Sequence, residues 1–282
     1  MKIIHKKDLL NDILKPYRNQ KISVGLVPTM GALHEGHESL VKTSLATNEV
    51  TVVSIFVNPT QFNNKADLSK YPRNLERDVA ILKKLDPSIV IFAPEVEEIY
   101  EDKVVSESFD FDGLENKMEG KHRKGHFDGV GTIVAQLFKI IKPTNAYFGE
   151  KDYQQLLIIK KMVSKLSIPV TIVPCPILRE VNGLAMSSRN ERLSAELREN
   201  ASIIYKSLQT AKKLFKAHSP EKVLETVSGL FEKSGDFDLE YVEIANAETL
   251  EPIAEKQPDT KYRIFVAVYA GDVRLIDNLA LN

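Results

Sequence analysis

Residues 22–37 read ISVGLVPTMGALHEGH, and this stretch decides how the first half of the chain folds. The apolar run 22–27 predicts a buried strand, and residues 38–45 have helical spacing, so His34 and His37 fall at a strand-to-helix turn. Such a turn points backbone N–H groups at an anion, and neutral imidazoles there can donate hydrogen bonds to phosphate oxygens. The stretch is therefore a candidate site for the phosphates of ATP.

Taken alone, the pair His34 and His37 has other interpretations. Two histidines at this spacing also form half of a metal site, cap a helix or pair on a solvated surface. By itself the pair favours these interpretations over a nucleotide site. The rest of the chain has to decide between them.

The charge of the chain is nearly balanced, with 38 Lys and Arg against 39 Asp and Glu. Such a chain has no global field that would favour nonspecific binding to a nucleic-acid backbone or an acidic membrane. The composition therefore favours small-molecule chemistry, with neither nucleic acid nor membrane as a partner. At 282 residues, the chain is long enough for one large domain and a smaller one.

The single cysteine, Cys175, has no second cysteine for an internal disulfide and lies in an apolar run that predicts a strand. A packed, inert thiol is the expectation there. The first residues lack the apolar core of a signal peptide, and no segment supplies the ~20 apolar residues of a membrane helix. We therefore expect a cytoplasmic protein.

Apolar β-branched runs alternate with amphipathic helical stretches through the first part of the chain. The predicted strands are 22–27, 50–57, 88–93 and 170–177, and the predicted helices are 36–47, 74–85, 128–141 and 153–166. This alternation is typical of an α/β fold with a Rossmann-like parallel sheet covered by helices. In open sheets of this kind, ligands bind beyond the carboxyl ends of the strands.

The pattern changes after residue 180. Helical stretches near 194–217 and 220–234 precede strands near 239–245 and 262–270, with a turn at Gly271-Asp272. We therefore expect residues 1–178 to form the larger domain and residues 179–282 to form a smaller α+β domain.

Two further polar clusters follow predicted strands. Asn58 and Gln61 come after the run ending at Val57, and an amide there can hold a hydroxy-carboxylate; the competing interpretation is a turn at Asn58-Pro59 with a solvated Gln61. Gly149-Glu150-Lys151-Asp152 follows a short strand, and Lys151 can reach a phosphate. The alternative is a helix cap at Asp152 beside a surface lysine.

Two polar segments are also candidates for phosphate binding. Residues 183–190 place Ser187, Ser188 and Arg189 in a loop before a predicted helix, where the alternative role is capping by serine. Residues 120–131 combine basic side chains with four glycines and predict a phosphate-side loop, or else a solvated basic loop.

Several familiar site motifs are absent from the sequence. It has no Gly-x-x-x-x-Gly-Lys-Ser/Thr loop, no Gly-x-Ser-x-Gly elbow and no paired-cysteine zinc pattern. Gly129 and Gly131 lack the third glycine of a dinucleotide-binding fingerprint.

Linked motifs along the whole chain resemble the pantothenate synthetase family, also called pantoate–β-alanine ligases, in order and spacing. They are Pro28 to His37, Ser54 to Phe62, Tyr71-Pro72-Arg73, Gly125-His126-Phe127, Phe148 to Gln155, Gly183 to Asn190 and Arg274 to Asn278. The combination is far more specific than any one motif, and it reverses the local preference for the simpler interpretations.

The resemblance implies a nucleotidyltransferase-type Rossmann-like domain with His34-Glu35-Gly36-His37 as the HIGH-type motif. Met186 to Arg189 would be the counterpart of the KMSKS loop, carried by a C-terminal domain that closes over the site. In this family, ATP and pantoate give pantoyl adenylate and pyrophosphate. β-Alanine then attacks the acyl carbon and gives pantothenate and AMP.

The resemblance also implies which residues act. The catalytic group would be His37, as proton donor, with His34, Lys151 and Arg189. The ATP site would comprise Met30, Gly31, Ala32, Leu33, His34, Glu35, Gly36, His37, Gly149, Glu150, Lys151, Asp152, Leu178, Met186, Ser187, Ser188 and Arg189. Pantoate and β-alanine would be bound by Gln61, Gln155, Asn58, Arg123 and His126.

The resemblance further implies Mg²⁺ as the ion accompanying ATP and a homodimer formed through the N-terminal domains. Asp78 is a metal-ligand candidate, although it also fits a solvated position on the helix near 74–85. Lys124 departs from the family pattern, in which proline commonly stands between the arginine and the glycine.

Two other functions remain open from the sequence. A nucleotidyltransferase that moves AMP or CMP onto a phosphate would share the HIGH-type turn, but Gln61 and Gln155 favour a hydroxy-acid pocket. A different class is a noncatalytic nucleotide-binding or RNA-interaction module descended from synthetases, for which the balanced charge and the missing anticodon-binding extension count against RNA.

Overall fold

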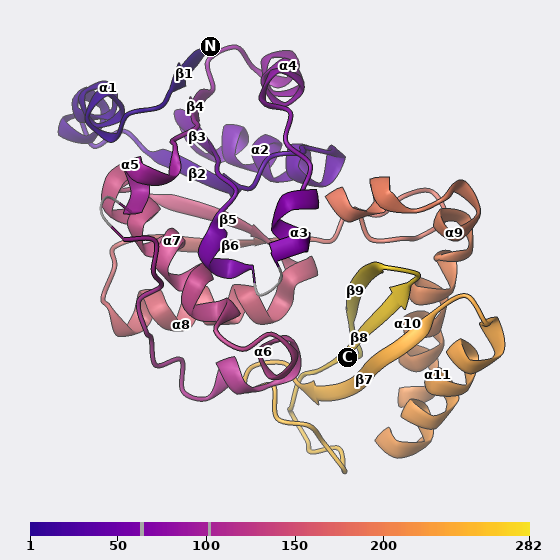
Figure 1. Ribbon diagram of the computed structural model, residues 1–282. Helices are drawn as coiled ribbons and strands as arrows, with labels where there is room; N and C mark the ends of the chain where they lie inside the picture. The colour runs from indigo at the N-terminus through magenta and orange to yellow at the C-terminus, as the bar shows by residue number, and fades with distance from the viewer. Residues whose placement is uncertain (63–64, 101–102) are drawn as a thin grey trace. The chain divides into compact units, whose positions relative to one another are not determined.

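Parallel strands form a six-stranded sheet in the order β1-β4-β3-β2-β5-β6 (Figure 1). The strands are β1 (Lys2–Ile4), β2 (Val24–Thr29), β3 (Val50–Ile55), β4 (Val90–Phe92), β5 (Asn145–Gly149) and β6 (Thr171–Cys175). The predicted α/β class with a Rossmann-like parallel sheet is thus confirmed.

The structure is a computed structural model that describes residues 1–62, 65–100 and 103–282. It divides into two compact units. Unit 1 comprises Met1–Glu150 and Gln155–Pro176, and unit 2 comprises Lys151–Gln154 and Ile177–Asn282. The chain therefore passes between the units after residues 150, 154 and 176.

Helices connect the strands of the parallel sheet. They are α1 (Lys7–Asn19), α2 (Glu35–Thr47), α3 (Lys65–Lys70), α4 (Leu75–Leu85), α5 (Val96–Tyr100), α6 (Met118–His122), α7 (His126–Ile141) and α8 (Tyr153–Lys165). Short 3₁₀ turns lie at η1 (Pro59–Gln61), η2 (Leu114–Asn116) and η3 (Glu150–Asp152). The segment 120–131 is mostly helical, in α6 and α7, so the predicted glycine-rich loop there is wrong.

The central strands are apolar on both faces because helices cover both faces of the sheet. Val27 of β2 and Val53 of β3 pack in one core cluster with Val41 of α2 and Leu82 of α4. Leu26, which alternates with Val27 along β2, is equally buried on the opposite face. The continuous apolar run that predicted the strand therefore reflects burial on both sides.

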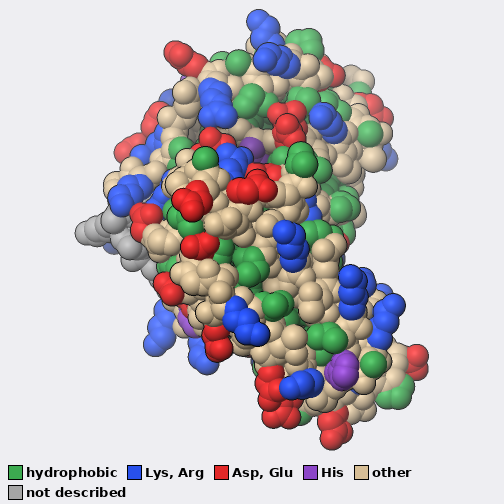
Figure 2. Space-filling model, turned by 90° about the vertical axis from the view of Figure 1, so that its right-hand side faces the viewer, with side chains coloured by type: hydrophobic (Ala, Val, Ile, Leu, Met, Phe, Trp, Pro, Cys, Tyr) green, Lys and Arg blue, Asp and Glu red, His purple; other side chains and the backbone are tan. Residues whose placement is uncertain are grey.

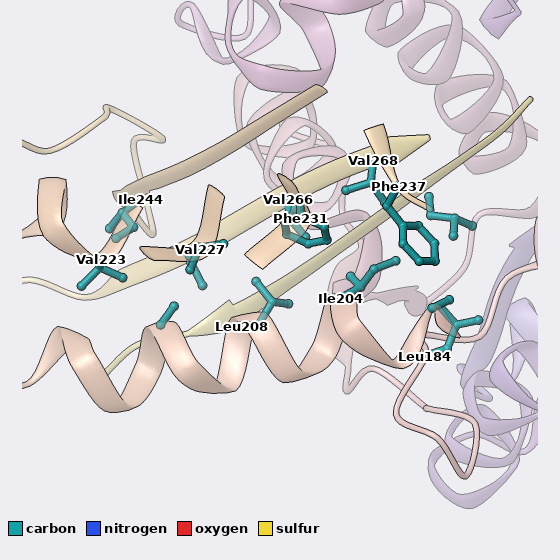
Figure 3. Close-up of a cluster of buried hydrophobic side chains, with 14 of the residues drawn as sticks. Leu184, Ile204, Leu208, Val223, Val227, Phe231, Phe237, Ile244, Val266 and Val268 are labelled. Carbon is teal, nitrogen blue, oxygen red and sulfur yellow. The ribbon is translucent and has the colours of Figure 1, made fainter. Parts of the chain in front are cut away.

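Unit 2 contains an antiparallel sheet in the order β7-β8-β9. Its strands are β7 (Asp238–Asn246), β8 (Tyr262–Ala270) and β9 (Val273–Ala280), and its helices are α9 (Ala195–Asn200), α10 (Ser202–Phe215) and α11 (Pro220–Ser234), preceded by the 3₁₀ turn η4 (Ser188–Arg192). Figure 3 shows the side chains that join these helices to the sheet, among them Leu208 from α10, Val227 from α11 and Val266 from β8. The predicted helix-and-sheet composition of this part is confirmed.

The predicted continuous helix 194–217 is wrong, because the structure has two helices that meet at Ala201. The Asn182 side chain explains where the first helix ends. Its Nδ2 donates to the carbonyl oxygen of Arg198 at 2.8 Å, a group that the next helical N–H would otherwise satisfy. Asn182 lies outside the helical stretch, so helical spacing alone does not reveal this end.

The distribution of charge on the surface agrees with the nearly equal numbers of basic and acidic residues. Figure 2 shows basic and acidic side chains interspersed over the face that it displays. Among the described residues, no helix combines the length and the apolar character needed to cross a membrane.

Candidate active site

Three adjacent strands of the sheet end beside polar segments. β2 ends at Thr29, with β3 on one side ending at Ile55 and β5 on the other ending at Gly149. The strands are parallel, so these carboxyl ends lie along one edge of the sheet. The chain order reverses at β2, which makes this edge the expected place for a ligand in an open α/β sheet.

The turn between β2 and α2 is held in an uncommon backbone conformation. Gly31 has a φ of +81° and Ala32 has a φ of +49°, both in the left-handed region. A Cβ at residue 31 would lie 2.9 Å from the Asp78 carboxylate, so glycine is required there for space as well as conformation. The Thr29 hydroxyl donates to Ser54 O at 2.8 Å and accepts from Gly31 N at 3.2 Å.

Asp78 lies in α4 with 1% of its surface exposed, and it holds this turn in place. Its two carboxylate oxygens accept backbone N–H bonds from Ala32 at 3.0 Å and from Leu33 at 2.8 Å. Burial raises the pKa of Asp78, although both backbone bonds act in the opposite direction. Asp78, the predicted metal-ligand candidate, is therefore buried and holds the turn between β2 and α2 in place through two hydrogen bonds from the backbone of that turn.

His34 is the N-cap of α2. Its Nδ1 accepts the backbone N–H of Gly36 at 3.1 Å, so Nδ1 is unprotonated and the proton of the neutral ring is on Nε2. The His34 and His37 rings lie side by side, with centroids 4.1 Å apart and planes tilted by 41°. The turn thus combines a capping histidine with a second imidazole at the start of one helix.

Leu33 and Glu35 occupy opposite environments in the same turn. The Leu33 side chain is 2% exposed and packs in the core with Val41, whereas Glu35 is exposed. Met30 is half-buried, with its Sδ accepting from Gln61 Nε2 at 2.9 Å. This contact brings the end of β2 to the segment that follows β3.

Gln61 is the centre of the second cluster. Asn58 Nδ2 donates to Gln61 Oε1 at 3.1 Å, and the backbone carbonyl of Gln61 accepts from His126 Nδ1 at 2.9 Å. Arg123 reaches the same carbonyl at 3.5 Å and forms an ion pair with Glu119 at 3.9 Å. The structure therefore brings the predicted residues Asn58, Gln61, Arg123 and His126 together in unit 1.

These four residues differ in how deeply they are buried. Asn58 is 1% exposed and His126 is 6% exposed, while Gln61 and Arg123 are half-buried. Lys124 is exposed between Arg123 and Gly125, and Gly125 is the N-cap of α7 with a φ of +77°. The turn before α7 thus obtains its left-handed residue from glycine, whichever residue stands at 124.

The segment after β5 is divided between the units. Gly149, Glu150 and Gln155 are half-buried in unit 1, and Lys151 and Asp152 belong to unit 2. In unit 2, the carbonyl oxygen of Lys151 accepts from Asn278 Nδ2 at 2.9 Å. The Lys151 ammonium lies 3.9 Å from the carboxylate of Asp152, and its side chain is 19% exposed.

A buried polar group in β9 supports this lysine segment. Asn278 is 2% exposed, and its Oδ1 accepts from the Arg263 guanidinium. The neighbouring Asp277 is 3% exposed and forms a two-pronged ion pair with Arg179, at 2.6 and 3.0 Å. These contacts explain the motif from Arg274 to Asn278, which sequence reasoning noted without a role.

Of the predicted nucleotide-binding residues in unit 2, Leu178 and Met186 face each other across a hairpin, and Ser187 to Arg189 follow it at the start of η4. Met186 N donates to Leu178 O at 3.0 Å, and Arg179 pairs with Ala185. Ser187 then caps η4 by accepting from Arg189 N at 3.3 Å, while Ser188 is buried. The structure therefore joins the backbone near Leu178 to the serine-arginine loop.

Sequence reasoning assigned no role in the site to three residues around these clusters. Tyr100 bonds Asn58, Gly129 offers that side chain its carbonyl oxygen, and Asn278 holds Lys151. The signal for Gly129 was a glycine inside a predicted helix, which indicates a close backbone approach. Tyr100 lies 42 residues from Asn58, and Asn278 lies 127 residues from Lys151, so neither contact carries a local signal.

The family model for pantoate-beta-alanine ligase matches residues 2–280 of the chain. Among curated relatives, the pantothenate synthetase of Flavobacterium psychrophilum is 56% identical over 282 residues, which cover 100% of both chains. The pantothenate synthetase of Christiangramia forsetii is 51% identical, again over 100% of both chains.

Solved structures of the same family resemble the whole fold. Pantothenate synthetase from Thermus thermophilus has a TM-score of 0.91 at 39% identity and covers 100% of this chain and 99% of its own. Pantoate-beta-alanine ligase from Francisella tularensis, complexed with beta-gamma ATP and beta-alanine, has a TM-score of 0.81 at 38% identity, with coverage of 100% and 98%.

Proposed function

The chain belongs to the pantoate–β-alanine ligase family, and we propose that it joins (R)-pantoate to β-alanine through a pantoyl-adenylate intermediate at the cost of ATP. The observation that supports this most directly is the strand-end cluster. The paired imidazoles of His34 and His37 lie at the end of β2, and the amide of Gln61, which follows β3, contacts Met30 beside them. One edge of the sheet thus offers groups for phosphate and for a hydroxy acid.

In the proposed first step, a carboxylate oxygen of pantoate attacks the α-phosphorus of ATP. The bond from that phosphorus to the bridging oxygen breaks, and pyrophosphate leaves with the electron pair. The carboxylate is already ionised at neutral pH, so this step needs no general base. Stabilising the charge that moves onto pyrophosphate is the main task of the protein.

We assign that task to four side chains. His37 donates a hydrogen bond to the phosphates as charge develops, and His34 helps to place them, while Lys151 and Arg189 supply positive charge. The remaining ATP contacts are assigned to residues 30–36, Gly149, Glu150, Asp152, Leu178 and 186–188. The neutral ring of His34, whose proton is on Nε2, suits a hydrogen-bond donor.

In the proposed second step, the amine of β-alanine attacks the acyl carbon of the adenylate. The new C–N bond forms, the bond from that carbon to the phosphate oxygen breaks, AMP leaves with the electron pair of that bond, and the nitrogen releases one proton to water. The amine has to arrive unprotonated, because its electron pair makes the bond. We assign pantoate to Gln61 and Gln155, with Gln61 also facing β-alanine and with Arg123 and His126 beside it.

ATP enters this proposal with Mg²⁺. The described residues contain no group of three or more His, Cys, Asp or Glu side chains able to hold a metal ion, and both oxygens of Asp78 already accept backbone bonds. Mg²⁺ commonly keeps water ligands and binds through substrate phosphates, which fits this set of residues. When bound, Mg²⁺ would neutralise phosphate charge.

The proposal also includes a cytoplasmic homodimer, as the family resemblance implies. The mass of the purified protein in solution, measured by light scattering, would be twice that of one chain. A monomer at the concentration of the activity assay would contradict the dimer without affecting the proposed reaction.

The reaction is tested by separating its halves. Purified protein with ATP should release pyrophosphate only when pantoate is present, and should form AMP and pantothenate once β-alanine is added. Omitting each substrate in turn provides the control. Folded protein that transfers AMP to a phosphate substrate, or that forms no pantothenate with all three substrates, would contradict the proposal.

A further inference from the structure

The side-chain amide of Asn58 is buried and has a fixed orientation. Its Nδ2 donates to the carbonyl oxygen of Gly129 at 3.0 Å and to Gln61 Oε1 at 3.1 Å. A backbone carbonyl can only accept, so the nitrogen of the amide has to face Gly129. The oxygen of Asn58 therefore faces the hydroxyls of Thr60 and Tyr100.

This orientation determines which group Gln61 presents. Because Asn58 donates to Gln61 Oε1, the nitrogen of the Gln61 amide is directed away from Asn58 and lies 2.9 Å from Met30 Sδ. A thioether is a weak acceptor, so a carboxylate or alcohol oxygen displaces it readily. The half-buried Gln61 is thus set to donate a hydrogen bond to an incoming ligand.

Two hydroxyls hold the acceptor end of Asn58. Thr60 Oγ1 lies 3.1 Å from Asn58 Oδ1, Tyr100 OH contacts the same oxygen, and the two hydroxyls are 2.8 Å apart. If one hydroxyl donates to the other, the second still has its own proton for Asn58. Burial raises the pKa of Tyr100, so its hydroxyl remains a donor at neutral pH.

We propose that Tyr100 is a positioning residue for substrate recognition, which together with Thr60 holds the Asn58 amide in the orientation that makes Gln61 a hydrogen-bond donor toward the hydroxy-carboxylate. The inference rests on the proposed function, since it takes pantoate as the ligand of Gln61. Tyr100 acts only through Asn58.

The hydroxyls are tested singly and together by steady-state kinetics. Tyr100→Phe keeps the ring packed 6.4 Å from Phe56 and leaves the Thr60 proton for Asn58, so the KM for pantoate should rise only ~3-fold. Tyr100→Phe with Thr60→Val removes both donors and should raise it ~10- to 100-fold. The kcat and the KM for ATP should stay within about 2-fold of wild type.

Two controls separate positioning from general damage. Tyr100→Phe with Thr60→Ser retains one hydroxyl and should behave like Tyr100→Phe alone. Tyr147→Phe removes the hydroxyl of a more deeply buried tyrosine, which accepts from Asn48 at 2.6 Å in the same unit. It should lower the melting temperature without changing the KM for pantoate.

Reversing the amide gives an independent test. Asn58→Asp has no donor, so Gln61 should rotate, direct its nitrogen to the new carboxylate and present its oxygen to the substrate. The affinity for pantoate, measured by calorimetry, should fall at least as much as in the double hydroxyl variant. Adding ATP should not restore the affinity of this variant for pantoate.

The outcomes distinguish this inference from the proposed function. An unchanged pantoate affinity in the double hydroxyl variant, or equal losses for pantoate and ATP, would overturn the role of Tyr100. Wild-type protein that binds pantoate but forms no pantothenate would overturn the proposed reaction instead. The calorimetric comparison would still decide whether Tyr100 acts.

Discussion

At the scale of single residues, His34 combines a structural task with the chemical task that we propose for it. Its Nδ1 caps α2, and its neutral ring keeps a proton on Nε2. His34→Ala should therefore lower the free energy of unfolding by ~0.5–2 kcal/mol, the usual cost of losing a helix cap, and should also slow adenylation. His34→Asn retains a capping oxygen, so thermal denaturation should return toward wild type while pantoate-dependent ATP–pyrophosphate exchange stays low.

His37 does not cap the helix, so its loss should separate chemistry from folding. His37→Ala is expected to slow ATP–pyrophosphate exchange by ~10²–10³-fold, the scale of removing one preorganised donor to developing charge. Its melting temperature should remain closer to wild type than that of His34→Ala. A larger kinetic defect in His34→Ala than in His37→Ala would reverse the roles assigned to the two rings.

At the scale of elements, α7 and η1 meet backbone to backbone at Gly129. A Cβ there would lie 2.4 Å from the carbonyl oxygen of Thr60, closer than such atoms approach. Gly129→Ala should therefore force the two elements apart, lower the free energy of unfolding by ~1–3 kcal/mol and raise the KM for pantoate. Chemical denaturation and steady-state kinetics measure the two effects.

Gly229 offers a matched control for that substitution. It lies inside α11, and a Cβ there would meet nothing within 4 Å. Gly229→Ala should stabilise the protein by ~0.4–1 kcal/mol, because alanine restricts the unfolded chain and favours a helix. Similar stability changes at both positions would show that the contact with Thr60 is unimportant.

Among the helices and strands, the sequence predicted those strands that are buried on both faces. Runs such as 22–27 and 50–57 revealed buried strands because helices cover both faces of the sheet, and the turn with His34 and His37 followed from them. β9 was missed because its buried Asp277 and Asn278 break the apolar pattern. Their partners, Arg179 and Lys151, lie 98 and 127 residues away in the sequence.

The candidate site was predictable to the same extent. Its residue types could be identified segment by segment, because the clusters with His34, Gln61 and Lys151 each follow a strand and the other segments are polar loops or turns in the sequence pattern. The orientation of Gln61 could not, because it depends on Asn58 and on a carbonyl oxygen 71 residues further along the chain. Hydrogen bonds between residues so far apart in the sequence arise from tertiary packing, and no repeating pattern of residues in the sequence predicts them.

At the scale of the whole molecule, the lysine proposed to meet the phosphates depends on β9. Asn278→Ala removes the hydrogen bond to the carbonyl oxygen of Lys151, and ATP–pyrophosphate exchange should fall ~10-fold. Asn282→Ala removes two comparable backbone bonds in unit 2, to Tyr262 and Thr260, and should leave the exchange rate near wild type. Equal rates in the two variants would contradict the dependence on Asn278.

The threefold passage of the chain between the units has a consequence for the order of synthesis. A ribosome makes residues 151–154 together with the parallel sheet, but the strand that holds Lys151 is made after every other described strand. A nascent chain can therefore complete its six-stranded sheet while this lysine segment still lacks its anchor. Premature termination before Asn278 would yield the turn with His34 and His37 without the support for Lys151, so the proposed activity would require synthesis to proceed through Asn278.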